Sequence, residues 1–214
     1  MRMIKEKEEI QLIKKALDIN RKIFKKIVKE IEPGIEETVI AGRIHYLIRK
    51  YGGRREAFEP IVASGVHSSY PHHKNRRKGI EKGKPLIMDA GVDFNGYKSD
   101  LTVTLFPGGK PGKKFMEYFK ILKDVQDSVM DFVKTGMTGG EVHSYAVRLL
   151  KKKGLDRYFI HGLGHGVGID VHELPVIADG SKDEIKKGCV FTIEPGIYIP
   201  GEGGIRLEEM VIIE

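Results

Sequence analysis

The sequence predicts an α+β domain in which two halves of the type α-α-β-β pack around an antiparallel sheet. Three features favour this class: helices with one apolar face, β-rich runs joined by a tight turn, and a segment that is repeated along the chain. Helices followed by strands are typical of α+β proteins rather than of doubly wound ones. The 214 residues are enough for one large domain with a real core. Because no shift in composition indicates a linker, we expect a single domain over residues 1–214.

The first helix is expected over residues 6–31, where apolar residues recur at steps of three and four on one face. These residues are Ile10, Ile13, Ala16, Ile19, Ile23 and Ile27. The sequence "EPG" at 32–34 should end this helix. A second helix is expected from about Glu36 to Tyr51, because "GG" at 52–53 suits a helix C-terminus.

Strands are expected next. "FEPIVASG" predicts a short strand that enters a loop, and "PLIMDAGVDF" and "GYKSDLTVTLF" predict two more, joined by "NG". The dipeptide Asn-Gly between β-rich runs is a strong hairpin signal. "PGGKPG" at 107–112 is typical of a loop, and helices are expected again at about 113–134 and 139–153. From residue 158 onward the chain is β-rich with glycine and proline turns.

Two segments of the chain resemble one another. "PGIEETVIAGRIHYLIRKYGG" (33–53) aligns without a gap with "TGMTGGEVHSYAVRLLKKKGL" (135–155). Shared helix–turn–helix patterning would account for this match. However, each segment follows a helix and precedes strands, so we favour two halves related by a pseudo-two-fold axis. Such halves would form one antiparallel sheet, with helices on its outer face and a functional site at the junction.

Composition indicates a globular protein of the cytoplasm. Apolar residues make up 40% of the chain and charged residues 31%, and no apolar run approaches the length of a membrane span. The first thirty residues are charged throughout and lack the apolar stretch of a signal peptide. The single cysteine, Cys189, excludes an internal disulfide. We therefore expect no membrane contact.

The formal net charge of +7 comes from short basic clusters at 74–78, 110–114 and 151–153. A basic balance can indicate nucleic-acid binding. These clusters contain no interleaved aromatic residues for base stacking. Solvated lysine is therefore favoured over nucleic-acid binding as a main role. An association with RNA or a ribosome is kept as an alternative, and strong salt dependence would be its signature.

Three histidines lie in "HGLGHGVGIDVHE" at 161–173. A helix is disfavoured there because each glycine costs roughly 1 kcal/mol relative to alanine. On a strand, alternation would place His161, Leu163 and His165 on one face and the glycines on the other, where another layer can approach closely. His172 has the opposite parity and needs a bulge or turn to face the same site. Any one of these histidines alone would be interpreted as a core or surface residue.

Four apolar β runs are each interrupted by an acid. These acids are Asp89, Asp100, Glu194 and either Glu208 or Glu209. A buried carboxylate is costly unless it is paired or bound to a metal ion. Each acid alone would suit an edge strand with a solvated charge, but four independent cases are less readily explained. Four carboxylates together with the imidazole of His165 are a ligand set for an oxygen-rich site that holds two metal ions.

These motifs resemble the metal-dependent pita-bread peptidases, the family of methionine aminopeptidases, aminopeptidase P and prolidases. The resemblance covers almost the whole chain and rests on the eleven-residue spacing from Asp89 to Asp100, "GHGVG", "HE-x-P" at 172–175, "TIEPGIYIP" and "GGIRLEE". It implies the pita-bread fold, a pseudo-two-fold duplication around a curved antiparallel sheet, which agrees with the internal similarity. It also implies a metallo-exopeptidase with two divalent metal ions.

The resemblance implies a role for each matching residue. The metal ligands would be Asp89, Asp100, His165, Glu194 and Glu208. Asp100 and Glu208 would bridge the two ions, and Glu209 would be a neighbour. The carboxylates suit Mn²⁺, and the histidine admits Co²⁺, Zn²⁺ or Fe²⁺. We expect Mn²⁺ or Co²⁺, with Zn²⁺ and Fe²⁺ as alternatives.

The resemblance further implies that His172, Glu194 and His72 are catalytic, with His172 contacting the scissile amide and Glu194 moving a proton to the leaving nitrogen. The residues that bind the substrate would be His72, His161, His172, Tyr198 and Arg206. His72 and His161 would shape the pocket, while Tyr198 and Arg206 would lie behind the metal ions. The partner would be a short peptide, and the formation of a homodimer is left open.

Two motifs favour one branch of the family. "GIRLEE" and "VASGVHSSYPH" are similar to the prolidase and aminopeptidase P branch, whereas methionine aminopeptidases carry Gln and a Glu-His pair in the last motif. Hydrolysis of the N-terminal Xaa-Pro bond of dipeptides or short peptides is therefore favoured over removal of an initiator methionine. The rival from another class is a non-catalytic relative that binds peptides or ribosomes. Because all five ligands are present, the sequence favours the enzyme.

The sequence departs from the family pattern in three ways. Prolidases and aminopeptidase P carry a separate N-terminal domain, but this sequence begins where their linker helix would start, and we interpret that domain as absent. Val103 stands where the common "SD-x-T-R-T" has Arg, which removes a charge near Asp100. The sequence also ends at "VIIE", sooner than relatives usually do. Dimerisation, substrate length and activity are left open by these differences.

Overall fold

The computed structural model describes residues 2–214, which form helices and strands in two successive sets. The helices are α1 (Lys7–Ile27), α2 (Glu37–Lys50), α3 (Lys113–Phe132) and α4 (Gly139–Lys151). The strands of the first set are β1 (Arg55–Glu56), β2 (Ile61–Ser64), β3 (Leu86–Ala90), β4 (Val92–Phe94), β5 (Tyr97–Lys98) and β6 (Leu101–Leu105). Those of the second set are β7 (Gly164–Gly166), β8 (Glu173–Ile177), β9 (Val190–Ile193), β10 (Gly196–Ile199), β11 (Gly203–Arg206) and β12 (Glu209–Ile212). Two short 3₁₀ helices are η1 (Gly65–Ser69) and η2 (Asp156–Tyr158).

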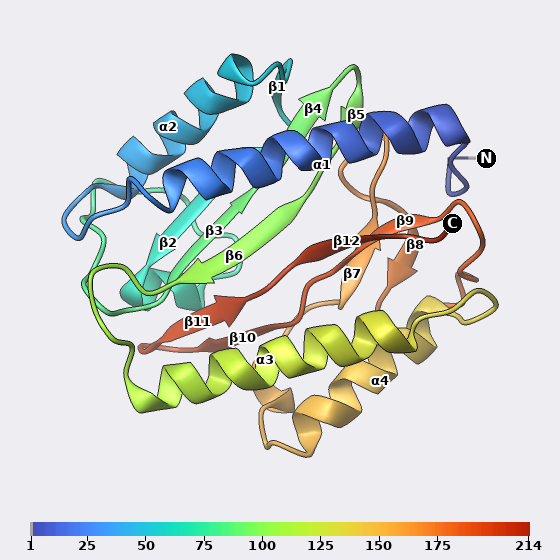
Figure 1. Ribbon diagram of the computed structural model, residues 1–214. Coiled ribbons are helices and arrows are strands. Elements are labelled where there is room, and N and C mark those ends of the chain that lie inside the picture. Colours follow the sequence, from blue (N-terminus) through green and yellow to red (C-terminus); the bar gives the residue numbers. More distant parts are fainter. Residues whose placement is uncertain (1) are drawn as a thin grey trace.

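The helices cover one side of the strands. In Figure 1, α1 and α3 run across the view, and β6, β11 and β12 lie between them. Helix α2 packs on α1 in the first set, and α4 packs on α3 in the second. The strand orders are β2-β3-β6, β1-β4-β5, β12-β9-β7-β8 and β10-β11, and every pair is antiparallel. The predicted α+β class is confirmed.

The two sets repeat one another in their hydrogen bonds as well as in their order. Gly34 has φ +94° and donates its N–H to Ile80 O, while Gly136 has φ +88° and donates to Ile185 O. At the other end of each helix, Gly53 N–H donates to Ile48 O just as Leu155 N–H donates to Leu150 O. The positive φ values explain why glycine opens both segments. The duplication predicted from residues 33–53 and 135–155 is therefore present in the backbone.

The strands do not form one uninterrupted sheet, because the long ribbons bend and leave their ladders at specific residues. Ser99 and Asp100 separate β5 from β6, Glu194 and Pro195 separate β9 from β10, and Leu207 and Glu208 separate β11 from β12. Three of the four predicted acids therefore occupy bends rather than strand interiors. The two halves meet at this place through the N–H of Glu208, which donates to Thr102 O at 3.1 Å.

The "NG" turn forms as predicted. Asn95 and Gly96 both have positive φ, at 51° and 90°, and they join β4 to β5 with Phe94 opposite Tyr97. Positive φ at both central residues is typical of the type I′ turn that matches the twist of paired strands. The first helix is shorter than expected, because it ends at Ile27 and turns occupy the residues up to 30. The second helix agrees with its prediction within one residue at each end.

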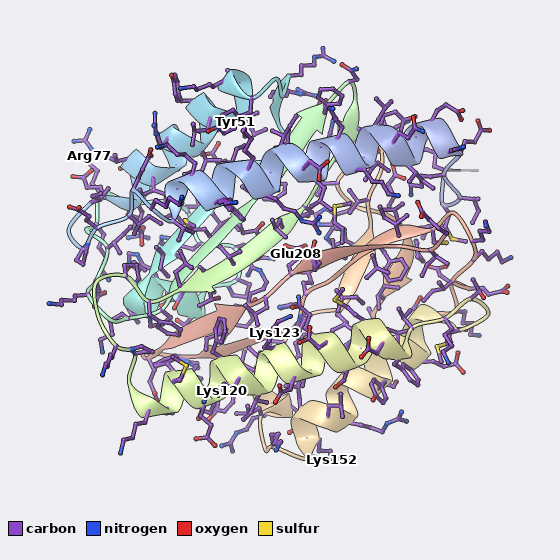
Figure 2. All side chains as sticks on the ribbon, viewed as in Figure 1. Tyr51, Arg77, Lys120, Lys123, Lys152 and Glu208 are labelled. Atoms are coloured by element: carbon purple, nitrogen blue, oxygen red, sulfur yellow. The ribbon has the colours of Figure 1, made fainter. Side chains whose placement is uncertain are left out.

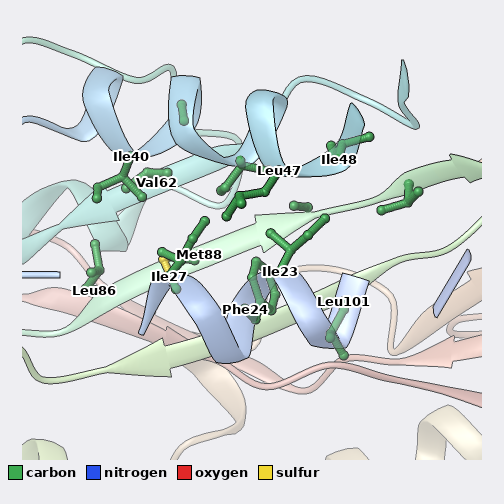
Figure 3. Close-up of a cluster of buried hydrophobic side chains, with 14 of the residues drawn as sticks. Ile23, Phe24, Ile27, Ile40, Leu47, Ile48, Val62, Leu86, Met88 and Leu101 are labelled. Atoms are coloured by element: carbon green, nitrogen blue, oxygen red, sulfur yellow. The ribbon is translucent and has the colours of Figure 1, made fainter. Parts of the chain in front are cut away.

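Each half has its own hydrophobic core between helices and strands. Figure 3 shows side chains of α1 and α2 converging on strand β3 in the first half. The labelled side chains are Ile23, Phe24, Ile27, Ile40, Leu47, Ile48, Val62, Leu86, Met88 and Leu101. Val103 packs against this cluster, so its side chain belongs to the core and not to the charged site. Within residues 2–214, no helix is long and apolar enough to cross a membrane.

Candidate metal centre

The predicted acids converge where the two halves meet. Asp89 lies in β3, opposite Thr102 of β6, and Asp100 and Glu208 lie at the bends that follow β5 and β11. All three carboxylates are buried, with relative exposures of 8%, 4% and 5% for Asp89, Asp100 and Glu208. In Figure 2, Glu208 lies in the middle of the molecule between α1 and α3, whereas Arg77 and Lys152 lie at its edges. The acids are therefore central and these basic residues peripheral.

His165 joins the acids from the second half. Its Nε2 lies 3.3 Å from Glu194 Oε1 and 3.7 Å from Asp100 Oδ2. Donor atoms of Asp100, His165 and Glu208 all lie within 4.8 Å of one another. Side chains distant in sequence thus lie together, and Asp89 lines the same cavity.

Glycines allow the strand that carries His165 to fit between its neighbours. A Cβ on Gly164 would lie 1.9 Å from Thr192 O, and one on Gly166 would lie 2.1 Å from Leu174 O. This close approach on both sides agrees with the strand predicted from the alternating glycines, although β7 is limited to three residues. The predicted alternation is wrong for Leu163, which is fully buried in the second core while His161 and His165 line the cavity. The reason is that residues before Gly164 lie outside the regular strand.

His172 reaches the same place through an irregular segment, as its parity required. The pairing of β7 with β8 shifts register between His165 and Gly166, and a bend follows before β8 begins at Glu173. The rings of His165 and His172 have their centroids 4.1 Å apart. The second histidine is thus brought to the first by a β-bulge.

Burial and mutual repulsion raise the pKa values of the clustered acids. Burial and then the charge of Glu208 hold the pKa of Asp100 well above its ordinary value. Burial and then the charge of Glu194 do the same to the pKa of Glu208. Burial raises the pKa of Glu194 to about 7, although Arg206 opposes this rise. Carboxylates this close cannot all be ionised cheaply without a counter-charge.

The histidine in the cluster is neutral at neutral pH. Burial, followed by the neighbouring His172, lowers the pKa of His165 to about 4. Its Nδ1 lies 3.2 Å from Gly166 O, so we assign the proton to Nδ1 and leave Nε2 free to bind. A neutral imidazole whose other nitrogen donates to a carbonyl is the usual form of a metal-binding histidine.

The cluster fits metal ions better than it fits any arrangement of its own hydrogen bonds. Among the buried side-chain atoms of residues 2–214, Asp89 Oδ1 and Asp100 Oδ1 lack a hydrogen-bond partner. Buried polar atoms are rarely left so unless an ion or water satisfies them. Divalent ions would supply the missing partners and the missing positive charge, and oxygen-rich sets with one imidazole suit such ions.

Arg206 supports the acids from behind. Its Nη2 donates to Asp89 Oδ2 at 2.6 Å, its Nη1 to Tyr198 Oη at 2.9 Å, and its Nε to Thr102 Oγ1 at 3.2 Å. The Thr102 hydroxyl in turn donates to Glu208 Oε2 at 2.7 Å. One buried guanidinium thus orients two of the acids, one directly and one through a hydroxyl. Thr102 was not among the predicted site residues, although it is the first threonine of the "SD-x-T-R-T" pattern.

A cavity of about 1030 Å³ opens above the acids. His161, His165, His72 and His172 line it together with the clustered acids and Arg206. His72 and His172 are exposed, whereas His161 is partly buried. The predicted site residues thus divide into a buried floor of acids and a wall of histidines.

Tyr198 and His161 form one fixed pair. Burial lowers the pKa of His161 to about 4 and raises that of Tyr198 to about 12, so both are neutral. His161 Nδ1 lies 2.6 Å from Gly162 O, and its Nε2 lies 2.9 Å from Tyr198 Oη. We assign the tyrosine hydroxyl as the donor to Nε2, while it accepts from Arg206. Tyr198 is buried and contacts two residues that line the cavity, His161 and Arg206.

Thr102→Val should weaken metal binding by about 10–100-fold, because it removes the hydroxyl that orients Glu208. Val103→Thr is the matched control, since that side chain packs against the first core. Metal affinity measured by calorimetry should fall for the first variant and stay unchanged for the second. Equal affinities for Thr102→Val and the unmodified protein would contradict this account of the support.

Comparisons with known proteins identify relatives of this chain. Residues 11–214 match metallopeptidase family M24. The Xaa-Pro dipeptidase of Pyrococcus furiosus is 41% identical over 213 residues, which cover 100% of this chain and 61% of that protein. The solved prolidase from Pyrococcus furiosus has a TM-score of 0.97 and 42% identity, covering 99% of this chain and 63% of that one. The X-Pro aminopeptidase from Thermotoga maritima has a TM-score of 0.96 and 38% identity, with coverage of 100% and 60%.

These likenesses confirm the pita-bread fold that the sequence resemblance implied. The chain spans about 60% of the length of the relatives that it matches.

Proposed function

This chain belongs to metallopeptidase family M24, and we propose that it hydrolyses the N-terminal bond of Xaa-Pro dipeptides or short Xaa-Pro peptides. The observation that carries the proposal is a floor of buried acids, two of them with unpartnered oxygens within residues 2–214, beneath a cavity walled by histidines. The names of the relatives, Xaa-Pro dipeptidase and prolidase among them, support the choice of a prolyl bond. A short peptide substrate is the only partner that we propose.

Members of this family use divalent metal ions, and we propose that two are held here, with Mn²⁺ or Co²⁺ preferred. The ligands would be Asp89, Asp100, His165, Glu194 and Glu208. Asp100 lies 3.7 Å from His165 and Glu208 accepts from Thr102, so each of these acids contacts a residue of the other half, which supports their role as bridges. When bound, such a pair of ions lowers the pKa of a water molecule and polarises a carbonyl group.

The protein's own side chains would handle the protons and the developing charge. Glu194 lines the cavity beside His165, which supports its proposed role of taking a proton from water and releasing it to the leaving nitrogen. His172 is exposed at the cavity wall and would donate a hydrogen bond to the carbonyl oxygen as negative charge develops there. A prolyl nitrogen has no N–H, so this site needs no acceptor for one.

The wall of the cavity would hold the proline ring and the peptide. His72 and His161 line that wall, and His161 is fixed by Tyr198, which supports their assignment to the substrate pocket. Arg206 would act from behind the acids, since its guanidinium donates to Asp89, Tyr198 and Thr102.

Activity on matched dipeptides tests the proposal. The protein, loaded with Mn²⁺ or Co²⁺ and with its metal content verified, should hydrolyse Met-Pro faster than Met-Ala, because the pocket would favour the prolyl ring. Amino-acid release is the measurement, and Met-Pro-Ala compares a longer substrate with the dipeptide. Hydrolysis of Met-Ala alone would indicate a methionine aminopeptidase. Absence of turnover with metal bound would contradict the enzyme, and absence of bound metal would favour a binding protein.

A further inference from the structure

The most deeply buried carboxylate lies away from the metal centre. Glu37 is the first residue of α2 and has 0% relative exposure. A buried carboxylate is costly unless hydrogen bonds satisfy it. The next residue, Thr38, lines the cavity, so Glu37 lies directly behind the cavity wall.

Four donors saturate this carboxylate. Its Oε1 accepts from the N–H of Ser64 at 2.9 Å and lies 2.9 Å from His67 Nδ1. Its Oε2 accepts from the N–H of Arg76 at 3.0 Å and lies 2.8 Å from His73 Nε2. Burial alone would raise the pKa of Glu37, but these hydrogen bonds outweigh burial and hold the pKa below its ordinary value. The carboxylate is therefore ionised, and both imidazoles donate to it.

All four donors belong to one segment, residues 64–76. Ser64 begins the segment and Arg76 ends it, so a single side chain holds its two ends together. The segment carries His72, which lines the cavity. It also carries Pro71, whose carbonyl accepts from Arg206 Nη1 at 3.3 Å. Closure of this segment thus bears on the position of His72 in the cavity wall.

The fold itself does not require an acid at this position. In the second half, Gly139 aligns with Glu37, and the helix starts in the same way: Glu37 N–H donates to Lys78 O and Gly139 N–H donates to Asp183 O. A Cβ on Gly139 would lie 2.0 Å from Val176 O, so no side chain fits there. The acid is specific to the half that carries segment 64–76.

A glutamate and two histidines could also hold a metal ion, since donor atoms of Glu37, His67 and His73 lie within 4.8 Å of one another. Two observations favour hydrogen bonding. Each oxygen of Glu37 already accepts a backbone N–H as well as an imidazole. In the metal centre, by contrast, carboxylate oxygens are left without partners in the described chain.

We propose that Glu37 is a positioning residue, which closes segment 64–76 and thereby fixes His72 against the cavity. Its effect on catalysis rests on the proposed function, because that function gives His72 its role. Glutamine cannot replace Glu37: its amide has one oxygen, and either orientation turns an NH₂ group toward a backbone N–H, that of Ser64 or that of Arg76.

A double-mutant cycle separates positioning from a general loss of structure. Glu37→Gln should lower kcat/KM for Met-Pro by about 100-fold, since small misplacement of a site residue has effects of this size. In a His72→Ala background the same change should cost no more than about 2-fold, because the residue through which it acts is gone. Glu36→Gln, the same substitution one residue earlier at the start of α2, should leave the rate unchanged. Independent, multiplying effects of Glu37→Gln and His72→Ala would overturn the proposal.

Hydrogen exchange tests closure without any activity. In Glu37→Gln, amides of segment 64–76 should exchange about tenfold faster or more than in the unmodified protein and in Glu36→Gln, while those of β9 stay the same. If Glu37→Gln fails to fold, His73→Gln takes its place in this experiment. Because His73→Gln keeps both backbone hydrogen bonds to Glu37, we expect a smaller increase in exchange in the same segment. Unchanged exchange in segment 64–76 of Glu37→Gln would overturn the proposal. So would loss of a bound metal ion from Glu37→Gln when Glu36→Gln keeps its metal ions, because Glu37 would then act on the metal centre. Failure of the unmodified protein to cleave Met-Pro would refute the peptidase but leave this exchange result standing.

Discussion

Asp100→Asn should abolish peptidase activity and the binding of at least one metal ion. Asp100 is 4% exposed, and its Oδ1 has no partner in the described chain. A bound cation would supply that partner. An amide is neutral and offers one oxygen, which prevents bridging of two ions. The loss of kcat/KM should exceed the roughly 10–100-fold caused by losing a residue that merely supports a ligand.

Asp93→Asn is the matched control for this experiment. Asp93 is an acid of the neighbouring strand β4 with 1% exposure, but its carboxylate is paired with Lys98 at 2.7 Å and Arg55 at 3.2 Å. Its replacement should lower the free energy of unfolding and leave metal content unchanged. Metal content and kcat/KM are measured on both variants after reconstitution. An Asp100→Asn protein that keeps two ions and full activity would contradict the assigned centre.

The metal-free protein should lose stability as pH rises from about 4.5 to about 7. Burial raises the pKa of Glu194 from its ordinary 4.5 to about 7 in the folded state. A raised folded pKa means that the folded state binds the proton more tightly than the unfolded chain. Its contribution to stability is therefore complete below pH 4.5 and is lost as pH rises through 7. The difference corresponds to roughly 3 kcal/mol in the free energy of unfolding.

Urea unfolding of the chelator-treated protein between pH 4.5 and 7.5 measures this effect, with Glu194→Gln as the control. Because the charge of Glu194 also raises the pKa values of Glu208 and Asp100, the difference between the two proteins reports Glu194 together with its repulsion of these acids. The free energy of unfolding of the unmodified protein should fall relative to that of the variant as pH rises. Added Mn²⁺ at pH 7 should restore the stability of the unmodified protein but not that of the variant. A difference that does not change with pH would argue against the clustered, buried state of this carboxylate.

Periodic patterns in the chain predicted most of the fold. Apolar residues at helical spacing predicted α1 within a few residues, "GG" at 52–53 predicted the end of α2, and Asn95-Gly96 predicted the β4–β5 hairpin. The repeat of 33–53 at 135–155 predicted two equivalent halves, which the paired hydrogen bonds of Gly34 and Gly136 bear out. These features depend on neighbouring residues, so local sequence carries them.

Other features of the structure were not predicted by these sequence patterns. The prediction that Leu163 shares a face with His165 was wrong, because the chain leaves regular strand geometry before Gly164. The single sheet expected at the junction is divided by bends at Asp100, Glu194 and Glu208. The sequence places Glu37 at the start of the second helix, and no local pattern indicates the four donors from residues 64–76 that hydrogen-bond to its carboxylate.

The sequence by itself determined which residues are available for a metal centre, since an acid inside an apolar run is costly without a cation. It also determined the order of helices and strands. Only the tertiary structure decided which atoms of Asp100, His165 and Glu208 meet, which oxygens lack partners, and that Glu37 ties the two ends of segment 64–76. The physical reason is that these contacts join residues far apart in the chain. Their distances are set by the packing of both halves, which no local pattern encodes.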